Sequence, residues 1–276
     1  MELPSSPLRV RLDLGRAAAA PPWTFPVPMT PSPEIPAASP RTRASVVTID
    51  GPAGAGKSTV ARAVAEQLGM AHLDTGAMFR AVTWVLLSEA SSSDLLVCAE
   101  GESLDQLEAA ACDVLAARTF GLDAQGAVTV DGRALGDELR TPRVDAAVSR
   151  VAALRAVREP MLQLQRAFAE RGPMVCEGRD MGTAVFPEAR FKFYLDASVA
   201  ERARRRLADF AARGRAASAA EIEAEIAARD QTDAEREIAP LRCADDAVRI
   251  DTTGLTIGDV VAQIVARVRG VGEGAA

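Results

Sequence analysis

The sequence predicts an α/β fold, in which helices cover both faces of a parallel sheet. Short β-branched or apolar runs alternate with longer stretches of helical periodicity. A glycine-rich loop lies between the first such run and the first helix. The 276 residues are 48% hydrophobic and 25% charged, usual for a globular chain of one large or two small domains. The predicted strands are 46–49, 70–73, 174–176, 191–195 and 247–250.

The loop after the first predicted strand has the Walker A pattern, G-x-x-x-x-G-K-S, and an amphipathic helix follows it as far as about Gly69. Glycines let successive N–H groups curl around a phosphate, and the helix N-terminus adds positive potential. Lys57 is one of only two lysines beside 30 arginines, so chance placement is a poor explanation. We expect Lys57 to reach the β- and γ-phosphates and Ser58 to hold Mg²⁺. The predicted ATP-binding residues are Gly51, Pro52, Ala53, Gly54, Ala55, Gly56, Lys57, Ser58 and Thr59.

The pattern changes between about residues 90 and 140. A helix is predicted near 104–117, followed by strands at 120–122 and 127–130 with turn residues at Asp131-Gly132. A further helix, 198–212, carries a run of four arginines. At 3.6 residues per turn these arginines cannot all face one ligand, so most are predicted to form a solvated helix face, with one or two contacts to the lid. They are Arg202, Arg204, Arg205 and Arg206.

Residues 1–44 differ from the rest of the chain, because ten of the 16 prolines fall there. Such density predicts an extended, disordered tail. The tail has no continuous apolar segment of the kind a secretory signal needs. Acidic residues count against a transit peptide, and an over-extended start, with Met29 as one alternative beginning, is another explanation.

Composition excludes several classes of function. The net charge of −6 removes the usual electrostatic reason for nucleic-acid binding, and no apolar run approaches the 20 residues of a membrane span. The four cysteines lack C-x-x-C spacing, and His72 is the only histidine, which argues against a zinc site or a disulfide framework. We therefore expect isolated thiols in a reducing, cytoplasmic setting, and a structural role for His72 in its apolar stretch.

The Walker A pattern alone leaves several functions open. A guanine-specific GTPase would carry an N-K-x-D motif, which is absent, and the D-x-x-G match at 251–254 lies too near the C-terminus. A switch or binding module that hydrolyses nucleotide slowly remains an alternative from another class.

Several motifs in order point to a small-molecule kinase. They are D-T-G-A-M-F-R at 74–80, L-R-T at 139–141, Ser149, V-R at 157–158, Q-R at 165–166, G-R-D-M-G-T-A-V-F-P at 178–187, and an R-D-x-x-D-x-x-R-x-x-x-P-L segment at 229–241. With the loop, these make the sequence resemble the bacterial cytidylate kinase family from about residue 45 to 270. The resemblance implies a monomeric P-loop kinase domain over 45–276, with an acceptor-binding insertion at about 76–165 and a mobile lid at about 204–236.

The resemblance also implies the reaction and its residues. The γ-phosphoryl group of MgATP would pass to CMP or dCMP, and planar guanidinium groups suit this task because they bind phosphate bidentately. The implied catalytic residues are Lys57, Arg179, Arg229 and Arg236. The implied acceptor-binding residues are Thr75 and Arg80, with Arg179, Arg229 and Arg236 for phosphate, Ser149, Arg158 and Asp180 for cytosine, and Asp233 for the ribose hydroxyl.

The chain departs from the family pattern at three positions. Phe79 replaces a common tyrosine, and Glu177 replaces the usual aspartate and could shift a water-mediated Mg²⁺ contact. Thr232 stands where some relatives carry a charged residue. Asp180 could act as a base, but a phosphate acceptor is already ionised and needs none. Kinases acting on UMP, AMP, dTMP or shikimate are the nearest alternatives.

Overall fold

The computed structural model describes residues 46–89, 104–123, 126–212, 214 and 217–270. The predicted tail at 1–44 lies outside these ranges, as does part of the predicted insertion. Among the described residues, no helix combines the length and the apolar character needed to cross a membrane.

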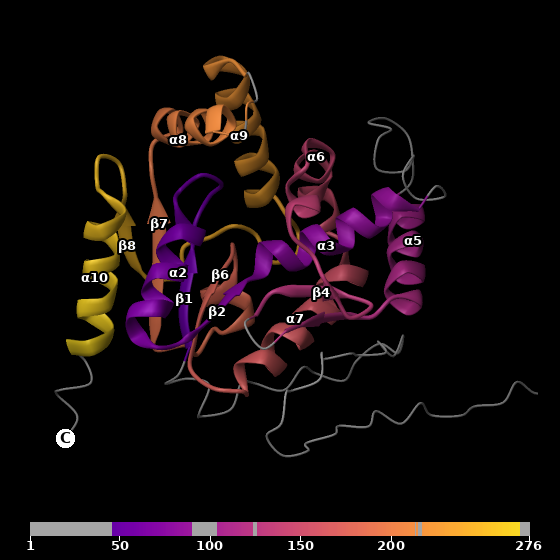
Figure 1. The fold of residues 1–276 in the computed structure, drawn as a ribbon, viewed down its shortest axis with the longest axis horizontal. Coiled ribbons are helices and arrows are strands. Elements are labelled where there is room, and N and C mark those ends of the chain that lie inside the picture. Colours follow the sequence, from indigo (N-terminus) through magenta and orange to yellow (C-terminus); the bar gives the residue numbers. More distant parts are fainter. Residues whose placement is uncertain (1–45, 90–103, 124–125, 213, 215–216, 271–276) are drawn as a thin grey trace, which may run out of the picture.

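A five-stranded parallel sheet forms the centre of the molecule (Figure 1). Its strand order is β2-β6-β1-β7-β8, which confirms the predicted fold class. Each strand ends one residue later than predicted, because its last residue is acidic and breaks the apolar pattern while backbone pairing continues. The strands are β1 (Val46–Asp50), β2 (Ala71–Asp74), β6 (Met174–Glu177), β7 (Phe191–Asp196) and β8 (Val248–Asp251).

Helices bury both faces of this sheet. Alternate residues of β1 point to opposite sides, so Val46 joins one apolar cluster while Val47 and Ile49 join the other. The first cluster includes residues of α3 (Thr75–Ser88), α5 (Leu104–Ala117), α6 (Pro142–Val151) and α7 (Arg155–Ala169). The second includes residues of α2 (Lys57–Leu68) and α10 (Ile257–Gly270), which pack together.

The region between α5 and α6 forms a small antiparallel sheet of β3 (Phe120–Leu122), β4 (Val128–Val130) and β5 (Arg133–Ala134), followed by the short helix η1 (Asp137–Arg140). Asp131 and Gly132 join β4 to β5 with φ of 51° and 78°, so the predicted turn is confirmed. The two-residue strand β5 was not predicted, because it is exposed and too short to show alternation.

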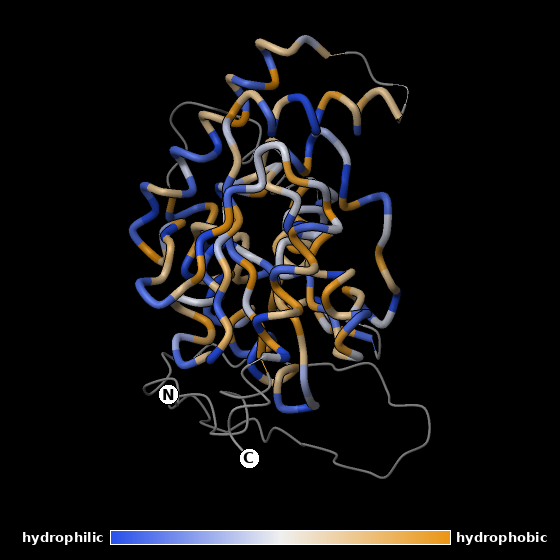
Figure 2. Tube along the Cα trace, turned by 90° about the vertical axis from the view of Figure 1, so that its left-hand side faces the viewer, coloured by the Kyte–Doolittle hydropathy of each residue, from blue (hydrophilic) through white to orange (hydrophobic). Residues whose placement is uncertain are grey.

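Helices α8 (Val199–Ala212) and α9 (Ala219–Ala234) pack on each other and stand above the carboxyl ends of the strands (Figure 1). Figure 2 shows the pair from the side, again above the body of the molecule. Their shared core is small and consists of Ala203, Phe210, Ile222 and Ile226. Ser218 and Glu221 form a capping box that fixes the start of α9. This helical pair occupies the place expected for the lid.

Candidate functional site

The glycine-rich loop curls at the carboxyl end of β1 and leads directly into α2. Gly51, Gly54 and Gly56 all have positive φ, of 145°, 79° and 87°. A Cβ on Gly51 would lie only 2.0 Å from the carbonyl oxygen of Leu195, so a side chain cannot be accommodated there. The loop thus has the strand–loop–helix setting that phosphate binding requires. Thr59, in the first turn of α2, is exposed.

Lys57 is folded back into the loop. Its side chain is 6% exposed, and Nζ donates to the carbonyl oxygen of Pro52 at 2.7 Å. Burial, followed by repulsion from Arg179 and Arg229, lowers the pKa of Lys57 from 10.5 to about 7. A bound anion would favour the charged form of Lys57 and so raise its pKa, and the loop is therefore suited to bind an anion.

Ser58 and Glu177 face each other across the end of β6. Ser58 Oγ donates to Glu177 Oε2 at 2.7 Å, and Thr75 Oγ1 donates to the Glu177 carbonyl oxygen at 2.6 Å. His72 Nε2 lies 3.2 Å from Glu177 Oε1. The imidazole therefore contacts the carboxylate beside Ser58, although its neighbours in the sequence are apolar. A hydroxyl beside a carboxylate offers the hard oxygen donors that Mg²⁺ prefers, and the residues present fit that ion.

The lid residue Asp233 ties predicted acceptor residues together. Its carboxylate is 1% exposed and accepts from Arg179 Nε at 2.8 Å, from Arg236 Nη2, and from Ser149 Oγ at 3.2 Å. Burial pushes the pKa of Asp233 upward, but Arg179, Arg236 and Arg229 hold it below its usual value. The structure therefore brings residues of α6, the turn after β6 and the predicted lid to one point.

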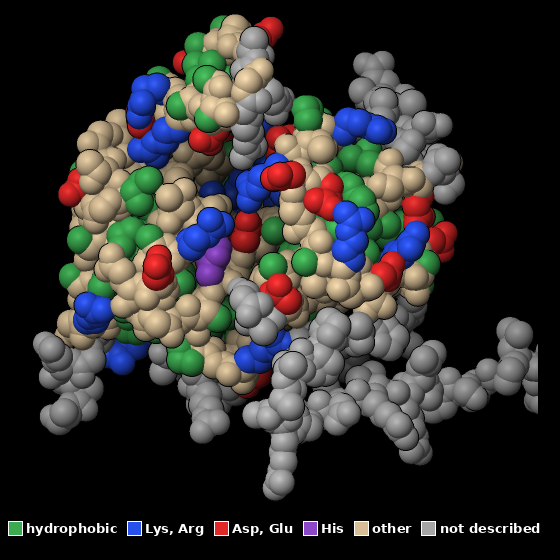
Figure 3. Space-filling view, viewed as in Figure 1, with side chains coloured by type: hydrophobic (Ala, Val, Ile, Leu, Met, Phe, Trp, Pro, Cys, Tyr) green, Lys and Arg blue, Asp and Glu red, His purple; other side chains and the backbone are tan. Residues whose placement is uncertain are grey.

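Two more arginines border this point. Arg80 pairs with Asp145 at 2.7 Å and donates to the Leu139 carbonyl oxygen at 3.0 Å. Arg229 has no hydrogen bond or ion pair with any residue that the structure describes, and its Nε is buried. Burial, and then repulsion from Arg179 and Arg80, lowers the pKa of Arg229 to about 10. Arg229 thus lies close to other cations and forms no ion pair with the described residues. Figure 3 shows Lys and Arg side chains lining the hollow between lid and body.

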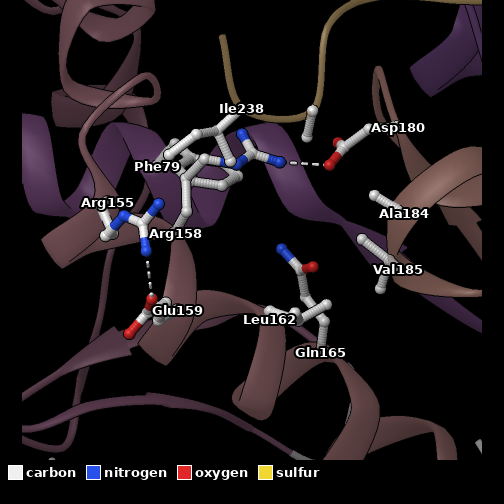
Figure 4. A pocket seen from close by; sticks show the side chains of 11 residues that line it. Phe79, Arg155, Arg158, Glu159, Leu162, Gln165, Asp180, Ala184, Val185 and Ile238 are labelled. Carbon is white, nitrogen blue, oxygen red and sulfur yellow. Dashed lines mark hydrogen bonds and ion pairs between the residues drawn. The ribbon is translucent and has the colours of Figure 1, made fainter. Parts of the chain in front are cut away.

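Arg158 and Asp180 form a mostly buried ion pair at one end of a cavity of about 240 Å³ (Figure 4). The guanidinium of Arg158 lies over the Phe79 ring, 5.6 Å from its centroid, so Phe79 keeps a stacking function without a hydroxyl. Burial raises the pKa of Asp180, and Arg158 opposes that rise. The residues lining the cavity are Phe79, Arg155, Arg158, Glu159, Leu162, Gln165, Asp180, Ala184, Val185, Ile238 and Ala239.

Sequence reasoning missed one buried residue here. Asp50 accepts from the backbone N–H groups of Met181 and Gly182 at 2.9 and 2.8 Å, which fixes the short helix η2 (Met181–Val185), and burial raises the pKa of Asp50 to about 7. The position of Asp50, directly before the first glycine of the phosphate-binding loop, was the sequence signal that could have identified it.

Arg202 is an exception to the solvated helix face that was expected for most of these arginines, and it makes one of the lid contacts that the expectation allowed. Its side chain is buried and donates to the carbonyl oxygens of Ala197 and Ala53, at 3.0 and 3.1 Å, and to Asp230. It thereby connects the phosphate-binding loop to the lid. Arg204, in contrast, is exposed and pairs with Glu201, as expected for this face.

Comparison with known proteins agrees with this geometry. A family model described as Cytidylate kinase matches residues 47–270. A bifunctional pantoate ligase/cytidylate kinase of Synechococcus sp. (strain RCC307) is 48% identical over 82% of this chain and 43% of its own length. The protein of the same name from Synechocystis sp. is 48% identical over 81% of this chain and 42% of its own. The chain therefore spans less than half the length of these relatives.

Among solved structures, a gluconokinase from Sinorhizobium meliloti aligns over 84% of this chain and 95% of its own, at 16% identity and a TM-score of 0.36. That score is too low to support a structural argument.

Proposed function

Because the chain belongs to the cytidylate kinase family, we propose that it transfers the γ-phosphoryl group of MgATP to CMP or dCMP, giving ADP and CDP or dCDP. The observation that carries this proposal is the cluster of cations around Arg229. Arg179 and Arg229 lie near Lys57, Arg80 lies near Arg229, and Arg236 lies near Arg179. Arg229 forms no ion pair with any described residue, although Asp233 and Asp145 are close enough to attract it. Phosphate groups are the ligands that such a cluster fits.

The residues divide the work by position. Lys57 and the loop N–H groups bind the β- and γ-phosphates, while Arg80, Arg179, Arg229 and Arg236 hold the acceptor phosphate and stabilise the transferred group. Ser58, with Glu177 beside it, holds Mg²⁺, which when bound neutralises phosphate charge. No general base is needed, because the acceptor oxygen is already ionised. Asp180 is therefore free to position the cytosine ring.

The cavity beside Arg158 and Asp180 receives the cytosine. Asp180 accepts from the exocyclic N4 amine and Arg158 donates to a ring acceptor. Ser149, which donates to Asp233 in the free protein, is the third residue assigned to the base. Uracil offers an oxygen where cytosine offers the amine, so Asp180 favours CMP over UMP. Asp233 accepts from the ribose hydroxyl when the nucleotide displaces its present contacts. The lid excludes water that would hydrolyse ATP.

The protein acts, in this proposal, as a cytoplasmic monomer on small molecules, without nucleic acid or a membrane as partner. Cys112, Cys176 and Cys243 are free thiols, in keeping with a reducing compartment.

The test is ADP release by the full chain with MgATP and, separately, CMP, dCMP, UMP, AMP, dTMP and shikimate. We expect CMP and dCMP to accelerate release well above the other acceptors. Equal, slow release with every acceptor would contradict the proposal and favour a nucleotide-hydrolysing switch.

A further inference from the structure

Gln165 is a buried side chain with an unsatisfied donor. It lies on α7 and is only 1% exposed, and its amide nitrogen makes no hydrogen bond with any residue that the structure describes. The next residue, Arg166, donates to the carbonyl oxygens of Val185 and Ala184 at 2.9 and 3.2 Å. The helix is therefore anchored at this turn, and the unpaired amide is a local exception. A buried donor without an acceptor is costly, so it calls for a partner.

The amide points into the cavity that Arg158 and Asp180 border. Figure 4 shows Gln165 reaching from α7 toward the space beside that ion pair, with its amide nitrogen on the side of the pair. Most other lining residues are apolar, and the remaining charged residues, Arg155 and Glu159, pair with each other at 3.8 Å. Arg158, Asp180 and Gln165 are the mostly buried polar side chains of the lining, whereas the Arg155–Glu159 pair is exposed.

These three groups match the hydrogen-bonding edge of cytosine. That edge has one donor, the N4 amine, and two acceptors, N3 and O2. Asp180 supplies an acceptor for N4, and Arg158 supplies a donor for N3. We propose that the amide nitrogen of Gln165 donates to O2 of the bound cytosine. This assignment rests on the proposed function, since it takes the cavity as the base pocket.

The proposal separates two kinds of selectivity. Uracil also has O2, so Gln165 favours both pyrimidines equally, and adenine has no carbonyl to offer it. Asp180 and Arg158 distinguish cytosine from uracil, because uracil has the O4 oxygen in place of the N4 amine and an N3–H donor in place of the N3 acceptor. Changes at Gln165 and at Asp180 therefore have different signatures in a comparison of CMP with UMP.

The first experiment measures steady-state kinetics and thermal unfolding of Gln165→Met, a substitution that keeps the length of the side chain and removes its hydrogen-bond donor. We expect KM to rise about 3- to 10-fold for CMP and by the same factor for UMP, with KM for ATP unchanged. The melting temperature without nucleotide should not fall, because the variant loses an unpaired buried donor. The control is Gln67→Met, on the exposed end of α2, which should change none of these values. An unchanged KM for CMP, or a lower melting temperature with equal increases in both KM values, would overturn the proposal.

The second experiment compares CMP with 2-thio-CMP, whose sulfur is a weak acceptor at the position of O2. Wild-type protein should bind the thio analogue about 3- to 10-fold more weakly, and Gln165→Met should bind the two ligands equally. An equal loss in both proteins would refute the contact with O2. Failure of wild-type protein to prefer CMP among the acceptors would refute the proposed function instead, so the two failures are distinguishable.

Discussion

Replacing Arg229 by methionine is predicted to stabilise the nucleotide-free protein while removing most of its activity. Arg229 is partly buried, faces repulsion from Arg179 and Arg80, and has a pKa lowered to about 10. A folded-state pKa below the unfolded one means that folding penalises the charged form. The penalty is fully present below about pH 10 and is lost as the pH rises above about 10.

The size of the penalty follows from that difference in pKa. The lowering of the pKa to about 10 corresponds to at most about 3 kcal/mol, and the remaining solvent contact reduces the penalty to about 1–2 kcal/mol. For a chain of this size, relief of that penalty raises the melting temperature by about 2–6 °C. Loss of one positioned cation from a phosphoryl-transfer site lowers kcat by about 10²- to 10³-fold.

Thermal unfolding at pH 7 and steady-state kinetics with MgATP and CMP check both effects. The matched control is Arg204→Met on the lid, because Arg204 is exposed and pairs with Glu201. The control should change stability by no more than about 0.5 kcal/mol and leave kcat unaltered. A lower melting temperature for Arg229→Met with an unchanged kcat would refute the reasoning.

Three further predictions address other parts of the site. Because Lys57 has a pKa of about 7 in the free protein, ATP binding at pH 8 should be accompanied by proton uptake. Calorimetry in buffers of different ionisation enthalpy detects this uptake, and Lys57→Met should abolish it. A binding enthalpy of wild-type protein that does not depend on the buffer would contradict the prediction. Asp180→Asn should lower the ratio of kcat/KM for CMP to that for UMP by about 10- to 100-fold, and an unchanged ratio would exclude Asp180 from base selection. Gly51→Ala should destabilise the protein by more than about 2 kcal/mol in denaturant unfolding, since its Cβ would lie 2.0 Å from the Leu195 carbonyl oxygen, whereas Gly270→Ala has open space; equal stability of the two variants would refute the steric argument.

The sheet and the loop were predictable because their signals are local. Apolar periodicity marked the five strands, and glycine spacing marked the loop between β1 and α2. The ends of the strands were less visible, because backbone pairing extends one residue into acidic positions such as Asp50 and Glu177. These acidic ends lie at the edge of the sheet where the site forms.

The contacts within the site were less predictable because they join distant segments. Ser58 and Glu177 are 119 positions apart, and Arg202 bonds to Ala53 across 149 positions. Arg202 looked like any helix arginine, and Gln165 looked like an ordinary residue of α7, until packing buried them. Tertiary packing, which periodicity does not describe, decided both cases.

The most direct test of the central claim is to follow CMP and MgATP with the full chain by ³¹P NMR. The account predicts that CDP appears in step with ADP, one molecule for each, and that Arg229→Met slows both together. ADP accompanied by inorganic phosphate, with no CDP, would contradict the account and identify the protein as a hydrolase of ATP.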